Sequence, residues 1–218
     1  MLDIYFIIPS IGRKSLKQTI DSLNQLKSKN WNALIIFDDV EPLICFNGHS
    51  IHYIKIEKTG IQAKKNNAGL VRNVGLEYIL KNNIKTKYIG FCDDDDTLHP
   101  NFIEYLNNDI QLFNEPELII YRMMFPNGNV IPHPLTTKIQ MKNVGISFVF
   151  KKELLEKYKL TFINHPYEDY IFVQQAKKNP INILISKYVN YFVKTTFEIQ
   201  QKSIKNYPPI LFENNIKK

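Results

Sequence analysis

Short apolar runs that end at proline or charged residues recur through the first half of the chain and restrict the folds available to it. Residues 4–8 are continuously apolar and are followed by Pro9, as expected for a strand buried on both faces. Residues 33–37 and 88–92 predict two similar strands, and residues 52–56 predict a further one. Strands that are apolar on both faces are typical of a parallel sheet covered by helices.

Amphipathic helices are predicted between these strands. Apolar side chains at spacings of four, three and three residues mark one face of a helix over about residues 15–29: Leu16, Ile20, Leu23 and Leu26. Val71, Val74 and Tyr78 mark a second helix, which leads to the strand at residues 88–92. This alternation predicts an α/β fold in which helices connect mostly parallel strands.

The second half of the chain has a different pattern. Strands are predicted at residues 118–124 and 146–150, with a turn at Asn127-Gly128-Asn129 between them. The other predicted elements are a helix with Ile103, Leu106 and Ile110 on its apolar face, helices at residues 153–157 and 168–177, and apolar runs at residues 181–185 and 188–193. We expect a single domain over residues 1–218, built from halves of about residues 1–97 and 98–218.

Polar residues cluster where the predicted strands end. Residues 10–13 follow the first strand, Asp38 and Asp39 end the second, and residues 93–96 follow the strand at residues 88–92. Ligands of open α/β sheets bind beyond the carboxyl ends of the strands. These three loops are therefore expected to converge on one site.

Four consecutive aspartates occupy residues 93–96, although adjacent carboxylates repel one another unless they are solvated, hydrogen-bonded or neutralised by a cation. Their place at a strand end favours a cation. Mg²⁺ and Mn²⁺ prefer oxygen ligands, typically one or two carboxylates together with the oxygens of a substrate diphosphate. The pattern predicts that Asp93 and Asp95 hold Mn²⁺ or Mg²⁺, and the alternative is an acidic turn that stabilises the following helix.

Five segments, in the same order along the chain, resemble the glycosyltransferases of the GT-A fold, and most closely their family 2. They are Ile7-Ile8-Pro9-Ser10, Phe37-Asp38-Asp39, Val71-Arg72-Asn73-Val74-Gly75, Phe91-Cys92-Asp93-Asp94-Asp95-Asp96, and Tyr167-Glu168-Asp169-Tyr170 with the stretch from Gly145 before it. The resemblance covers about residues 4–175. It implies a GT-A fold whose first half binds a nucleotide-sugar and whose second half, with a C-terminal extension, binds the acceptor.

The resemblance also implies how the donor base would be recognised. Asp38 would accept hydrogen bonds from uracil or another base, and Asp39 is a second candidate beside it. Pro9 and Ser10 would line the same pocket, and Arg13 is a further candidate for binding the nucleotide. A UDP-sugar is the donor that the resemblance favours.

Further roles are implied for the diphosphate, the ribose and the metal. Arg72 would approach the donor diphosphate, because a guanidinium can bind phosphate oxygens bidentately, with Lys65 or its neighbour as a helper. The alternative for Arg72 is a surface cation on a helix. Asp93 would touch the ribose or the metal, Asp94 the ribose, and Asp95 would be the direct metal ligand.

Inverting transfer needs a base that takes the proton of the acceptor hydroxyl, and Asp169 is the candidate. It opens a predicted helix, so its carboxylate can project into the cleft, and Glu168 would raise its proton affinity by like-charge repulsion. The alternative is that the pair only stabilises the helix N-terminus. His133 and His165 lie in the acceptor half and are expected to be structural or exposed on loops.

The resemblance thus implies a metal-dependent inverting enzyme that moves a hexose to a hydroxyl of a glycan, a protein or a lipid-linked acceptor. The net charge of +7 suits an anionic partner, but the lysines are scattered and no nucleic-acid-binding motif is present, so nucleic acid is not expected. No segment approaches the roughly 20 apolar residues that cross a bilayer. We expect a cytoplasmic protein, with peripheral membrane contact left open, in which Cys45 and Cys92 are reduced.

Other functions compete for the same motif. Residues 93–97 also match the Asp-x-Asp-x-Thr signature of haloacid dehalogenase-like phosphatases, in which Asp93 would be the phosphoryl-accepting nucleophile. That signature usually lies on the first core strand, whereas several predicted elements precede it here. A sugar nucleotidyltransferase is disfavoured because the chain lacks a glycine-rich basic loop after its first strand. A basic binding module without turnover is the non-enzymatic alternative.

Overall fold

The computed structural model describes residues 2–42, 50–57 and 68–194 of the 218-residue chain. Lys65, predicted to help bind a diphosphate, and Cys45, predicted to be a reduced thiol, lie outside the described residues. None of the helices in the described part of the chain is long and apolar enough to span a bilayer.

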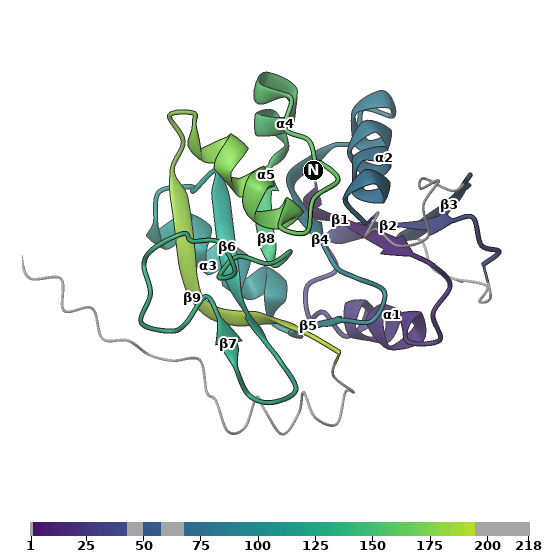
Figure 1. Ribbon diagram of the computed structural model, residues 1–218, viewed down its shortest axis with the longest axis horizontal. Coiled ribbons are helices and arrows are strands. Elements are labelled where there is room, and N and C mark those ends of the chain that lie inside the picture. Colours follow the sequence, from purple (N-terminus) through teal and green to yellow (C-terminus); the bar gives the residue numbers. More distant parts are fainter. Residues whose placement is uncertain (1, 43–49, 58–67, 195–218) are drawn as a thin grey trace, which may run out of the picture.

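The described strands form one mixed sheet with helices on both of its faces (Figure 1). The strands are β1 (Leu2–Ser10), β2 (Trp31–Asp38), β3 (Ile51–Ile56), β4 (Thr86–Phe91), β5 (Thr97–Leu98), β6 (Leu118–Met124), β7 (Val130–Ile131), β8 (Phe148–Lys151) and β9 (Ile183–Phe192). The helices are α1 (Leu16–Asn24), α2 (Ala68–Lys81), α3 (Phe102–Leu112), α4 (Lys152–Tyr158) and α5 (Glu168–Lys177). The strand order is β3-β2-β1-β4-β8-β6-β9-β5, and β7 pairs with β6.

The first half of the sheet is parallel, as the sequence predicts. Strand β1 pairs in parallel with β2 and with β4, and β2 pairs in parallel with β3. Strand β1 is buried along residues 4–10, which explains why its sequence is apolar without alternation. Parallel pairing brings the carboxyl ends of β1, β2 and β4 to one edge of the sheet.

The second half of the sheet is mixed and continues the first half without a break. Strand β8 joins β4 and β6 by antiparallel pairing, and β6 pairs in parallel with β9. The apolar runs at residues 181–185 and 188–193, predicted as separate segments, belong to one strand, because Ser186 and Lys187 continue the extended backbone between them. The two-residue strands β5 and β7 are too short to show a sequence pattern and were not predicted.

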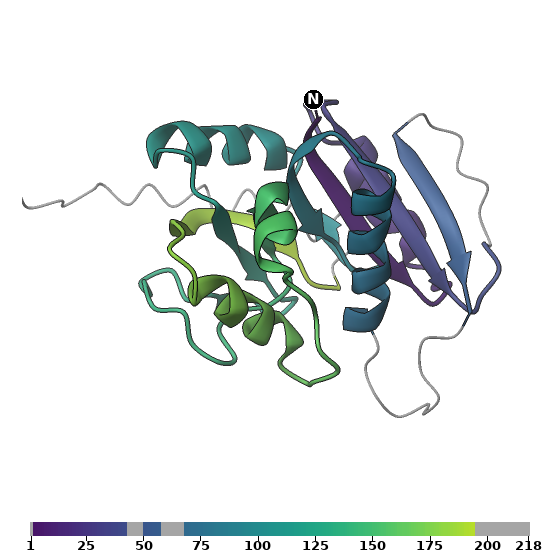
Figure 2. The ribbon, with the colours of Figure 1, turned by 90° about the horizontal axis from the view of Figure 1, so that it is seen from above.

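Helices α2, α4 and α5 cover one face of the sheet, and helices α1 and α3 cover the other (Figure 2). Helix α2 packs closely on β1 and β2, because a Cβ atom at Gly75 would lie 2.6 Å from Ile7 and 2.9 Å from Ile36. The buried side of α2 includes Val71 and Ile79. Val74 and Tyr78, which the spacing places on the same face as Val71, are only partly buried.

Helix α1 is shorter than the predicted helix over residues 15–29, since it ends at Asn24. The backbone N–H of Leu26 donates to the carbonyl of Leu23 at 3.0 Å, which tightens the last turn. The next N–H, that of Lys27, donates to the carbonyl of Pro100, so the chain leaves the helix there. Leu26 is nevertheless buried, which is why its spacing still fits the helical pattern.

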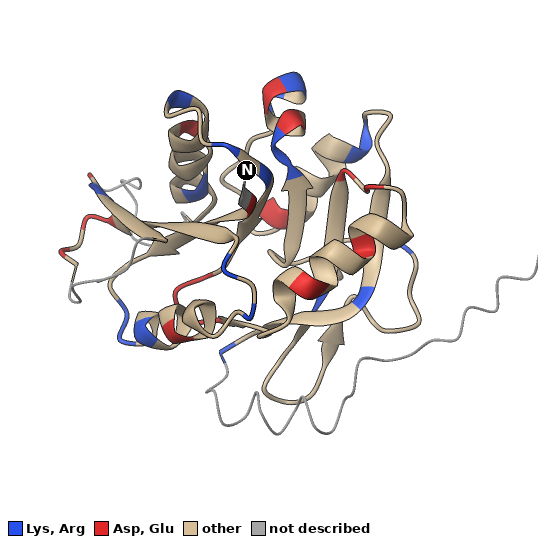
Figure 3. Ribbon diagram, turned by 180° about the vertical axis from the view of Figure 1, so that it is seen from behind, with Lys and Arg blue, Asp and Glu red and all other residues tan. Residues whose placement is uncertain are grey.

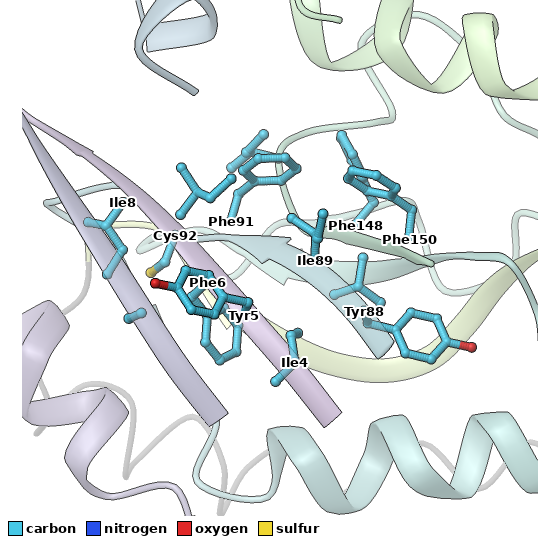
Figure 4. Close-up of a cluster of buried hydrophobic side chains, with 14 of the residues drawn as sticks. Ile4, Tyr5, Phe6, Ile8, Tyr88, Ile89, Phe91, Cys92, Phe148 and Phe150 are labelled. Carbon is cyan, nitrogen blue, oxygen red and sulfur yellow. The ribbon is translucent and has the colours of Figure 1, made fainter. Parts of the chain in front are cut away.

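Aromatic side chains fill the core between the central strands and the helices above them. Phe91 on β4 lies 5.5 Å from Phe148 and 6.2 Å from Phe150 on β8, measured between ring centroids (Figure 4). Phe162 and Phe172 stack on each other at 4.5 Å, and both pack against Phe91. The segment that leads into α5 is therefore anchored in the main core.

Candidate active site

The loop after β4 is tied to the end of β1 by Asp94, which is buried. Its carboxylate accepts hydrogen bonds from the Ser10 hydroxyl at 2.8 Å and from the backbone N–H of Ile11 at 3.1 Å. Arg13 donates to the other carboxylate oxygen. Ser10, Arg13 and Asp94, all predicted to lie at the donor site, are thus brought together. Both oxygens of Asp94 accept hydrogen bonds from residues that follow or end β1. Asp94 therefore holds the loop after β4 against the end of β1.

The loop after β2 contacts the loop after β1. Asp38 is the last residue of β2, and Asp39 has a left-handed backbone with φ of 59°. A Cβ atom at Gly12 would lie 3.3 Å from the side chain of Val40, so the loops after β1 and β2 are in contact. Pro9 is buried within β1. The predicted part of these residues in binding a nucleotide base stays a prediction.

Asp93 and Asp95 differ from Asp94 because they keep access to solvent. Their side chains are 31% and 20% exposed. Arg13 and Lys194 each place a nitrogen 3.8 Å from a different oxygen of Asp95. Partial burial is the main cause that raises the pKa of Asp95, and the neighbouring carboxylates add to it.

This donor set suits a hard divalent cation. Among the described residues, no group of three or more His, Cys, Asp or Glu side chains is arranged to hold a metal ion. Two accessible carboxylates are nevertheless the usual protein contribution to an Mg²⁺ site that substrate phosphates complete. Repulsion between Asp93 and Asp95 would fall on cation binding, and the metal at these two residues stays a prediction.

Residues 93–96, the aspartate loop, are contacted by β9 and by the residues that directly follow it. The hydroxyl of Tyr191 on β9 accepts the backbone N–H of Asp93 at 3.0 Å, and the backbone N–H of Lys194 donates to Asp96 at 2.9 Å. Burial raises the pKa of Asp96 to about 7. Thr19 of α1 donates to the Asp96 carbonyl at 2.7 Å. The loop that carries the four aspartates, red in Figure 3, passes beside α1.

Sequence reasoning missed Tyr191 and Lys194. Both lie about a hundred residues beyond the aspartate loop, and Tyr191 reads as an ordinary strand residue. Only the pairing of β9 with β5, through Thr97 and Leu98, shows that they meet the loop. No local signal in the sequence identifies them.

Arg72 on α2 lies among three carboxylates. Its guanidinium donates to Asp93 at 2.5 Å and to Glu168 at 2.7 Å, and it lies 3.5 Å from Asp169. Only 3% of its side chain is exposed, so the alternative of a surface helix cation is wrong. Its predicted contact with a diphosphate stays a prediction. The guanidinium joins the aspartate loop to the start of α5.

Asp169, the predicted base, lies at this junction. One quarter of its side-chain surface (25%) is exposed, while its Oδ1 atom is buried and has no hydrogen-bond partner among the described residues. Burial raises the pKa of Asp169 to about 7, Arg72 opposes the shift, and Asp93 and Glu168 add to it. The predicted repulsion from Glu168 is therefore a smaller cause than burial. A carboxylate with a pKa near neutrality is suited to general base catalysis.

The two histidines of the second half lie on loops. His133 and His165 are both exposed, as expected. The Nδ1 atom of His165 accepts the backbone N–H of Tyr167 at 3.1 Å, which shapes the turn before α5. Cys92 is buried and free, in agreement with a thiol that packs as a small hydrophobic residue.

Comparisons with known proteins agree with this architecture. No family model matches the chain. The poly(ribitol-phosphate) beta-N-acetylglucosaminyltransferase TarP of Staphylococcus aureus (strain N315) is 30% identical over 221 residues, which cover 91% of this chain and 64% of TarP. The chain therefore spans less than two thirds of this relative.

Solved structures of TarS from S. aureus have the same fold. The structure of TarS 1-349 matches with a TM-score of 0.67 and 15% identity, covering 94% of this chain and 64% of that one. Its complex with UDP-GlcNAc matches with a TM-score of 0.65 and 15% identity, covering 88% of this chain and 58% of that one. These findings confirm the predicted α/β fold and the resemblance to GT-A glycosyltransferases of the family 2 type.

Proposed function

We propose that this chain is an inverting glycosyltransferase that moves N-acetylglucosamine from UDP-N-acetylglucosamine to a hydroxyl of a polyol-phosphate polymer. The donor is that of the TarS complex, and the acceptor class is that in the name of TarP. The net charge of +7 suits a polyanionic acceptor. A hexosamine donor refines the hexose that the sequence predicts.

One observation carries the proposal: Asp93 of the aspartate loop and Asp169, the candidate base, both contact the guanidinium of Arg72. Arg72 contacts Asp93 and Asp169 through its two terminal nitrogens. The donor-side carboxylates and the base therefore face one site, as a single displacement at the anomeric carbon requires. Partial exposure of both side chains leaves them open to ligands.

The reaction then needs one proton transfer and one displacement. Asp169 accepts the proton of the acceptor hydroxyl, whose oxygen forms a bond to the anomeric carbon as the bond from that carbon to the UDP oxygen breaks. The raised pKa of Asp169 makes its carboxylate a stronger base than an exposed aspartate. Asp93 and Asp95 would hold Mn²⁺ or Mg²⁺, which neutralises charge on the departing UDP when bound. Asp38 is proposed to recognise the uracil.

The first experiment is a calorimetric titration of UDP and GDP, with and without Mn²⁺, into the native protein and Asp95→Ala. We expect Mn²⁺-dependent binding of UDP that is at least about tenfold weaker in the variant, because the direct metal ligand is lost. Asp21→Ala removes an exposed aspartate of α1 and should bind like the native protein. Release of UDP from UDP-N-acetylglucosamine with a polyol-phosphate acceptor then measures transfer.

The proposal is wrong if neither nucleotide binds the native protein. It is also wrong if UDP binds but no transfer occurs with that acceptor and Mn²⁺ or Mg²⁺. In the first case, hydrolysis of phosphate esters that is abolished by Asp93→Asn would instead support the phosphatase alternative.

A further inference from the structure

We propose that Glu168 and Arg72 are positioning residues, which together fix the base Asp169 against helix α2 and beside the aspartate loop. The inference rests on the proposed function and extends it. It assigns Arg72 a different part from the predicted contact with the donor diphosphate.

Glu168 is buried, and each of its carboxylate oxygens has a partner on α2. Oε1 accepts a hydrogen bond from Arg72 at 2.7 Å, and Oε2 accepts one from the backbone N–H of Gly69 at 3.1 Å. Neither of these partners belongs to α5, so Glu168 does more than stabilise its own helix N-terminus. Only 3% of Glu168 is exposed, so its carboxylate is turned to these partners and away from solvent.

Gly69 shows how close this contact is. A Cβ atom at this position would lie 2.2 Å from Oε2 of Glu168, closer than real Cβ contacts come, and 3.0 Å from Phe162, which is an unusually tight contact. The first turn of α2 therefore accommodates the Glu168 carboxylate only because residue 69 is glycine. The start of α5 thus approaches the backbone of α2 closely at this one position.

Helix α2 also holds the segment that leads into α5. The side chain of Asn73 donates to the Phe162 carbonyl at 2.9 Å and accepts the Phe162 backbone N–H at 2.8 Å. The ring of Phe162 lies 5.5 Å from the Arg72 guanidinium. Gly69, Arg72 and Asn73 of α2 thus hold both Glu168, next to the base, and Phe162, in the segment before α5.

The environment of Arg72 opposes a part in binding the diphosphate. The side chain is 3% exposed, and its guanidinium faces Asp93, Glu168 and Asp169. Turning towards a diphosphate would leave Glu168 buried without its cation, which is strongly unfavourable. Arg72 is therefore better suited to hold the carboxylates in place, with Asp169 oriented next to Glu168 along the first turn of α5.

Two variants test the proposal, Glu168→Gln and Arg72→Lys, compared with the native protein for UDP affinity and for kcat and KM of transfer. We expect kcat to fall by about 10² in each, the effect of a displacement of roughly 1 Å at a reacting group. UDP affinity and the donor KM should stay within about threefold, since no donor contact is removed. If Arg72 were instead a diphosphate ligand, Arg72→Lys would weaken UDP binding in parallel with transfer.

A matched control is Asp109→Asn, which changes a buried carboxylate of α3 that contacts none of these residues. It should leave kcat and UDP affinity unchanged, whatever its effect on stability. If Glu168→Gln does not fold, Asn73→Ala serves in its place, because it removes only the two hydrogen bonds to Phe162. Its kcat should fall by about fivefold with UDP affinity kept.

The outcomes separate the two proposals. A native protein that transfers no sugar contradicts the proposed function. An active native protein whose Glu168→Gln variant keeps its kcat contradicts the inference alone. Variants that lose UDP affinity by about tenfold or more, in step with transfer, overturn the inference in favour of donor binding.

Discussion

Two regions of the site each pair a buried carboxylate with a partly exposed neighbour, but they neutralise the buried group in different ways. In the aspartate loop, Asp94 is held by a hydroxyl, a backbone N–H and the half-exposed Arg13. At the start of α5, Glu168 is held by a backbone N–H and a fully buried guanidinium. The buried member fixes the backbone in both regions, and its neighbour keeps access to solvent.

The difference indicates how each region should respond to change. If the ion pair between Arg13 and Asp94 is broken, water can solvate the Arg13 guanidinium, because that side chain is half-exposed. Nothing can replace Arg72 beside Glu168, since both side chains are enclosed. We therefore expect changes in the loop to act on donor binding and stability, and changes at the start of α5 to act on kcat.

The largest effect is expected for Asp169→Asn. The variant keeps the shape of the side chain but cannot accept the proton, so kcat should fall by about 10² to 10⁴. UDP affinity, measured by calorimetry, should be unchanged because the aspartate loop is intact. A variant that keeps more than a tenth of the native kcat would remove Asp169 from the role of base.

The next effect is expected for Asp94→Ala, and it concerns stability. Removing the carboxylate leaves the Ser10 hydroxyl and the Ile11 N–H without their partner. The free energy of unfolding in urea should fall by about 2–3 kcal/mol, the cost of leaving such groups unsatisfied. Asp21→Ala, which breaks only an exposed pair with Lys17, should change it by less than about 0.5 kcal/mol. Equal effects would show that Asp94 does not organise the loop.

The dependence of transfer on pH separates the two regions further. Because the pKa of Asp169 is raised to about 7, the base is protonated at lower pH and inactive. The value of kcat/KM should therefore fall about tenfold for each pH unit below that pKa. UDP titrations with Mn²⁺ over the same pH range provide the control, since they separate a loss of donor binding from a loss of the base. A rate that is flat between about pH 5 and 7 would contradict the assignment.

The smallest effect is expected for Lys194→Ala. Its side chain is 69% exposed and lies 3.8 Å from Asp95, so it adds positive potential where the diphosphate would bind. Such an exposed contact contributes at most about 1 kcal/mol, which corresponds to a rise of up to about fivefold in the donor KM. Raising the salt concentration should reduce the difference between variant and native protein. A fall in kcat would place Lys194 with the base region instead.

Much of the first half of the molecule could be predicted from the sequence. Its strands are buried on both faces, so their apolar runs are visible without any knowledge of their partners. The parallel sheet then follows from the alternation with helices, and it places Ser10, Asp38 and residues 93–96 at one edge. The helix at residues 168–177 was predicted with the observed bounds.

The sequence alone determined the fold class and the position of the candidate site at the strand ends, because these depend on local patterns. Only the tertiary structure decided which carboxylates face solvent and which are structural. Asp93 to Asp96 are chemically identical side chains, and their surroundings depend on Ser10 at the end of β1, Tyr191 on β9 and Lys194 just after β9, which are distant in the sequence. The environment of Arg72 was likewise set by packing, because Glu168 and Asp169 reach it from a helix about a hundred residues away.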